Sequence, residues 1–109
     1  MTKFLLIQHG TAMGTWDPAD VRRHFAYQRG LDAELAAAGE LVETQGLGGP
    51  VTGARAAGAG ALPDLAGYRI VDVESEERAL QIAALAAAGP GPGGVPLRGP
   101  VDVRRMLTP

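Results

Sequence analysis

The order of the expected elements constrains the fold most strongly: strand, helix, strand, a long loop, and then strand, helix, strand again. Strands are predicted at four short runs rich in apolar residues, at residues 3–8, 41–47, 67–73 and 101–106. Two strand–helix–strand units in a chain of 109 residues fit a single domain, residues 1–109. The sequence therefore predicts an α+β fold, a ferredoxin-like βαββαβ sandwich in which one antiparallel sheet carries both helices on one face.

The boundaries of both expected helices carry recognisable signals. Asp17 can cap the first helix, and Pro18 suits its first position. This helix is expected to run to about residue 38, because Gly39 favours a left-handed stop. Ser75 is the expected cap of the second helix. On the first helix, the spacing predicts a buried stripe of Val21, Phe25, Leu31 and Leu35.

The strand at residues 67–73 has apolar side chains on both faces, whereas the helices can cover only one. The strand at residues 3–8 is likewise expected to be buried on both faces. A homodimer that packs sheet against sheet would bury the second face. Residues 46–66, rich in Gly and Ala, are predicted to form a long loop with a weak hairpin near residues 51–57.

Composition excludes several classes of protein and partner. The chain has no cysteine, so neither disulfides nor a Cys-based metal site are expected. Its net charge of −2, without a basic stripe, argues against nucleic acid as a partner. The apolar run at residues 4–7 is too short for a signal peptide, and no stretch approaches a membrane span. We therefore expect a cytoplasmic protein.

The first helix carries two polar residues on its expected buried stripe, His24 and Gln28, one turn apart. Buried polar side chains need hydrogen-bond partners or a cavity. Two interpretations remain open. The residues form a structural hydrogen-bonded pair, or they line a pocket in which His24 acts as an acid or base.

The end of the first strand is the second candidate region. In the expected sheet, His9 lies beside the beginnings of the third and fourth strands, at Tyr68 and Asp102. A carboxylate fixes the tautomer of a histidine and suits it to proton abstraction. The alternative is that His9 and Asp102 are solvated surface residues. The functional interpretation predicts one site at this end of the sheet, formed by Gln8, His9, Trp16, His24, Gln28, Tyr68 and Asp102.

The whole chain resembles the YCII-related (DGPF-type) family of small bacterial proteins. The matching segments are residues 3–7, 33–39, 41–42, 45–47, 65–73, 77–80, 90–97 and 100–104. The resemblance implies a ferredoxin-like fold that pairs into a dimeric α/β barrel. Some relatives are cofactor-free lyases, and the wider superfamily includes isomerases, monooxygenases and cyclases.

Two departures from the family pattern concern its functional residues. The Asp-Gly-Pro-Phe segment is missing, and residues 54–63 take its place. The proposed catalytic histidine of the broader family falls at Gln28, and its aspartate partner has no match near residues 86–90. His24, one turn before Gln28 on the same face, is the candidate substitute.

Two functions from different classes follow. The first is a cofactor-independent enzyme that uses acid–base chemistry for elimination, isomerisation or cyclisation of a small organic, in some relatives cyclic, substrate between the first helix and the sheet. Its catalytic residues would be His24, His9 and Asp102, and its substrate-binding residues Gln8, Trp16, Gln28 and Tyr68. The alternative is a non-catalytic small-molecule-binding or regulatory module. No metal is expected, since the two histidines lack the spacing of a metal-binding helix.

Overall fold

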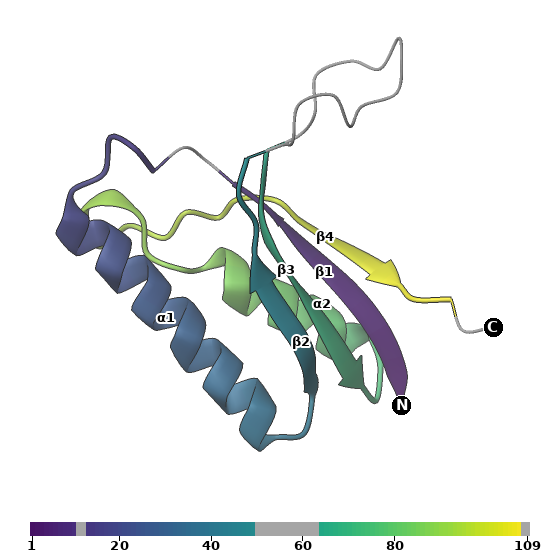
Figure 1. The fold of residues 1–109 in the computed structure, drawn as a ribbon. Coiled ribbons are helices and arrows are strands. Elements are labelled where there is room, and N and C mark those ends of the chain that lie inside the picture. Colours follow the sequence, from purple (N-terminus) through teal and green to yellow (C-terminus); the bar gives the residue numbers. More distant parts are fainter. Residues whose placement is uncertain (11–12, 50–63, 108–109) are drawn as a thin grey trace, which may run out of the picture.

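The computed structural model of the chain describes residues 1–10, 13–49 and 64–107. Within these residues, strands and helices follow one another in the predicted order (Figure 1). The elements are β1 (Thr2–His9), α1 (Pro18–Ala37), β2 (Leu41–Gly46), β3 (Leu65–Val73), α2 (Glu76–Ala87), a short 3-10 helix (Pro92–Gly94) and β4 (Val101–Arg105). The chain is therefore α+β, and this arrangement is compatible with the predicted ferredoxin-like fold.

The four strands form one open antiparallel sheet in the order β2-β3-β1-β4. β1 is flanked by β3 and β4, and both run antiparallel to it. The register places Ile7 opposite Tyr68 on one side and opposite Asp102 on the other. The end of β1 thus lies beside the beginnings of β3 and β4, as predicted.

The hydrophobic core lies between the helices and one face of the sheet. Because side chains alternate along a strand, Phe4, Leu6, Val71 and Val73 all point to this face, and each is at most 1% exposed. They pack against apolar residues of the two helices, Leu31, Leu35, Ala79, Ile82, Ala83 and Ala86. Figure 1 shows α1 beside β2 and α2 behind the central strands.

The other face of the sheet is covered by neither helix. It carries Leu5, Ile7, Tyr68 and Ile70, which are only half-buried. The prediction of a first strand buried on both faces is therefore wrong for the single chain, because only every second side chain reaches the core. We call this surface the open face of the sheet.

The helix boundaries follow the predicted signals in most respects. Gly39 adopts a φ of 73° just after α1, where a left-handed residue ends the helix. The Ser75 hydroxyl accepts a hydrogen bond of 3.1 Å from the Arg78 backbone N–H. Asp17 is the N-cap of α1, but its side chain makes no capping hydrogen bond. Neither helix of the described chain is long and apolar enough to cross a membrane.

The buried stripe of α1 differs from the prediction at two positions, Val21 and Phe25, and Val21 is only partly buried. Leu31 and Leu35 are buried as expected, but Phe25 is 47% exposed. His24, which was also predicted on this stripe, is only 8% exposed. Residues 24, 28, 31 and 35 keep the spacing of a single helix face, so two polar residues continue the apolar stripe.

The predicted long loop is shorter than expected at both ends. β2 extends to Gly46, and β3 already begins at Leu65. The hairpin predicted near residues 51–57 lies outside the described residues. The same holds for residues 54–63, which the resemblance places where relatives carry their motif.

Candidate functional site

A buried arginine is the centre of a polar cluster on the helix-facing side of the sheet. Arg69 lies on β3 two residues before Val71, so strand alternation directs it under α1, and it is only 4% exposed. Its Nε donates a 2.7 Å hydrogen bond to Asp32 Oδ1 on α1, which makes a buried ion pair. The positive charge is thereby compensated from the helix.

Two glutamines complete the cluster. Arg69 Nη1 donates to Gln8 Oε1 at 2.8 Å, and Nη2 donates to Gln28 Oε1 at 2.7 Å. Both glutamine side chains donate through Nε2 to the Ala86 carbonyl at the end of α2, at 3.4 Å and 3.1 Å. An arginine only donates and a carbonyl only accepts, so these contacts determine the orientation of both amides.

The cluster borders a pocket of about 160 Å³ between α1, the end of β2 and the beginning of β3. Gly67 lines the pocket and permits the close approach of β2 to β3 at this point. Any other residue would place its Cβ only 2.7 Å from the Gln45 carbonyl oxygen. The lining consists of Gln8, Phe25, Gln28, Arg29, Asp32, Thr44, Gln45, Gly46, Ala66, Gly67, Tyr68 and Arg69. We call this the helix–sheet pocket.

His24 is held beside this pocket rather than in its lining. Its Nδ1 lies 3.1 Å from the Pro90 carbonyl oxygen, and since a carbonyl only accepts, Nδ1 carries the proton in the neutral ring. The ring packs edge-on against Trp16 at 5.9 Å between centroids. Gly89 permits this packing, because a Cβ there would lie 3.2 Å from His24 Cε1 and 2.6 Å from Gln28 Nε2.

His9 and Asp102 form a second polar group on the open face. His9 Nε2 donates to Asp102 Oδ2 at 2.8 Å, with side chains 30% and 44% exposed. This hydrogen bond, aided by the charge of Arg104, lowers the pKa of the Asp102 carboxyl below its ordinary value. In neutral His9, the proton on Nε2 leaves Nδ1 as the proton acceptor.

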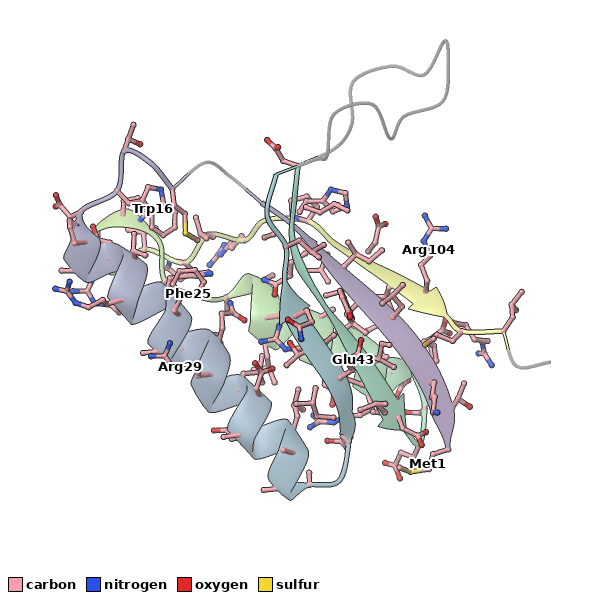
Figure 2. All side chains as sticks on the ribbon, in the orientation of Figure 1. Met1, Trp16, Phe25, Arg29, Glu43 and Arg104 are labelled. Carbon is pink, nitrogen blue, oxygen red and sulfur yellow. The ribbon has the colours of Figure 1, made fainter. Side chains whose placement is uncertain are left out.

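Tyr68 also presents its hydroxyl away from the buried cluster. The hydroxyl donates to Glu43 on β2, and this contact raises the pKa of Tyr68 above its ordinary value. Figure 2 places Glu43 on β2 and Arg104 on β4, whereas Trp16 and Phe25 lie near the beginning of α1.

The prediction of one site formed by all seven residues is therefore wrong. Strand alternation turns Gln8 to the helix side and His9 to the open face, although they are neighbours in β1. Gln8, Gln28, His24 and Trp16 gather on the helix side. His9, Asp102 and the Tyr68 hydroxyl lie on the open face.

The sequence reasoning missed Arg69 and Asp32, which hold the cluster together. One signal was available: Arg69 interrupts the apolar inward row that continues with Val71 and Val73. Asp32 follows Gln28 by one turn and therefore shares its helix face. A charged residue on each of two facing apolar stripes indicates an ion pair.

In the described ranges, no group of three or more His, Cys, Asp or Glu side chains could hold a metal ion. No protein-family model matches the sequence, and a search of curated proteins finds no match either.

Proposed function

We propose that this protein binds a small organic molecule in the helix–sheet pocket. The observation that carries the proposal is the placement of the buried Arg69 guanidinium and the Gln8 and Gln28 amides along a pocket of about 160 Å³. Binding sites typically combine an apolar concavity with a few fixed polar groups that orient the ligand. Because Asp32 and the glutamines hold Arg69 in place, the site is preorganised.

The position of His24 favours binding over catalysis in this pocket. Its Nδ1 proton is committed to the Pro90 carbonyl, and the lining of the pocket comes from other residues. A general base must lie within hydrogen-bond reach of the proton it removes. The pocket therefore offers recognition groups, with no histidine in its lining.

A cofactor-independent acid–base enzyme is the second candidate, and the His9–Asp102 pair supports it. The 2.8 Å hydrogen bond fixes the ring so that Nδ1 can accept a proton. The substrate would then lie at the β1 end of the open face, beyond the apolar residues Leu5, Ile7 and Ile70. Elimination is expected for such a base as in some members of the YCII-related family, which we propose as this chain's relatives, and isomerisation or cyclisation as in the wider superfamily.

A dimer that packs open face to open face accompanies both candidates. Leu5, Ile7 and Ile70 give this surface an apolar centre that the helices leave uncovered. A second copy would bury it and generate the dimeric α/β barrel. Analytical ultracentrifugation tests the proposed dimer. We expect the wild type to sediment as a dimer and Ile70→Lys as a monomer. A monomeric wild type would contradict the proposed dimer.

Binding to the pocket can be tested by blocking it. A Cβ at Gly46 would meet only the Ala66 carbonyl oxygen, 4.0 Å away, so Gly46→Leu places a side chain in the pocket without a clash at Cβ. Gly48→Leu is the matched control, because Gly48 is equally open and lies outside the lining.

The measurement is a screen of neutral, cationic and anionic ring-sized compounds, followed by backbone amide shifts in NMR spectra. We expect at least one compound to shift the amides of Gly67 and Arg69 in the wild type and in Gly48→Leu, but not in Gly46→Leu. Shifts confined to His9 and Asp102 would support the second candidate. Equal shifts in both leucine variants would refute binding in the pocket.

A further inference from the structure

Arg69 and the two glutamines of the helix–sheet pocket keep unused N–H donors. Among the described contacts, Arg69 Nη1 uses one of its two N–H groups, and each glutamine Nε2 uses one of two. The oxygens of both glutamine side chains already accept from Arg69. A ligand group that faces these free N–H groups must therefore be an acceptor.

The charge of the pocket lining also favours a ligand that accepts hydrogen bonds, and in particular an anion. Two arginines, Arg29 and Arg69, and one aspartate, Asp32, give the lining a formal charge of +1. The Asp32 charge is compensated by Arg69 at 2.7 Å. No described carboxylate forms an ion pair with Arg29, which is exposed at the pocket. An anionic ligand would meet an uncompensated positive charge.

The size of the pocket limits the apolar part of the ligand. A cavity of about 150 Å³ is large enough for benzene, and this pocket has about 160 Å³. Phe25, Ala66 and Gly67 supply apolar lining on both the helix side and the strand side. One six-membered ring or an aliphatic group of similar volume would fit.

We infer that the ligand is a small organic carboxylate, an inference that rests on the proposed binding function. Its oxygens accept from the free N–H groups of Arg69, Gln8 and Gln28, and Arg29 supplies a second positive charge. Its apolar part, about the size of one ring, lies against Phe25 and Gly67. Charge-assisted hydrogen bonds to arginine are stronger than neutral ones, so the anion is preferred over an uncharged molecule of the same shape.

Benzoate and benzamide provide the matched probes, because they share a ring and differ in charge. Each is titrated into the protein near pH 7 at low salt, and the amides of Gly67 and Arg69 report binding. Arg69→Gln is the obvious variant but removes the centre of a buried cluster. Arg29→Gln alters an exposed residue instead, with Arg22→Gln, exposed on the same helix and outside the lining, as its control.

We expect benzoate to bind about ten-fold more tightly than benzamide. Arg29→Gln should reduce this preference several-fold without changing benzamide binding, and Arg22→Gln should leave both unchanged. Equal binding of the two probes in the pocket would overturn the carboxylate inference and leave the proposed function standing. If neither probe shifts the pocket amides, the inference also fails, and the wider screen with the two leucine variants decides whether the pocket binds any ligand.

Discussion

Removal of Asp32 is the most informative perturbation of the buried cluster. Asp32→Ala deletes the only described carboxylate paired with Arg69, whose side chain is 5% exposed. Removing one partner of a fully buried ion pair costs about 3–5 kcal/mol, because the remaining charge has lost its compensation. The Asp32 side chain is 22% exposed, so water can enter the vacated position. We therefore expect a loss of about 2–3 kcal/mol of unfolding free energy.

Urea denaturation measures this loss directly. With a slope of about 1–3 kcal/mol per molar urea, the denaturation midpoint should fall by about 0.7–3 M. Arg23→Ala is a control on the same helix, because it removes an exposed ion pair of the same length, 2.7 Å to Asp20, with Arg23 53% exposed. Such pairs contribute less than about 1 kcal/mol.

A double-mutant cycle separates the ion pair from other effects of the substitution. In Arg69→Met the positive charge is gone, so a subsequent Asp32→Ala should cost little, and the coupling energy should reach about 2 kcal/mol. The reasoning is refuted if Asp32→Ala costs no more than Arg23→Ala, or if the coupling energy lies within about 0.5 kcal/mol of zero.

Three further predictions concern other features of the fold. Gly67→Ala places a Cβ 2.7 Å from the Gln45 carbonyl oxygen on β2, so it should lower the unfolding free energy, measured by urea denaturation, by about 1–3 kcal/mol. Gly46→Ala is the control and should cost less, because its Cβ would lie 4.0 Å from the nearest atom. Similar losses in the two variants would refute the steric argument. The lowered pKa of Asp102 stabilises the fold above its ordinary value of 3.8, and the effect is lost as pH falls through the lower folded value. NMR titration should therefore give a midpoint below 3.8 that rises in His9→Ala, and an unchanged midpoint would contradict the pairing. Ser75→Ala removes the α2 cap and should lower the unfolding free energy by about 1 kcal/mol, whereas Ser75→Asp, which can still cap, should lose much less.

The elements and their order could be predicted because each depends on local signals. Ser75 marks the beginning of α2 through its capping hydroxyl, and Gly39 marks the end of α1 through a left-handed φ that few other residues adopt. The proximity of His9 and Asp102 followed from strand order alone, and the 2.8 Å hydrogen bond agrees with it. Topology thus predicts which strand ends meet.

The face on which a side chain lies could not be predicted from proximity alone. Gln8 and His9 are adjacent in sequence and lie at the same end of the sheet, yet the pleat places them on opposite faces. Phe4 and Leu6 indicate that the even-numbered side chains of β1 face the core. This alternation separates the two faces only when one of them is exposed, and the sequence predicted burial on both. Phe25 is also misplaced: the spacing put His24 and Phe25 on the same expected stripe, and only His24 is buried.

The position of the polar cluster connects packing with function. The helix-facing row of β3 is apolar at Val71 and Val73 and becomes charged at Arg69, beside the pocket that Gly67 and Gly46 line. Stability alone does not favour this change, because apolar residues of similar volume often stabilise a fold as well as a buried ion pair does. An arginine that must be matched by Asp32 and two glutamines is costly to maintain in a core this small. Its coincidence with the pocket is better explained by recognition of an acceptor group, and the comparison of benzoate with benzamide tests that explanation directly.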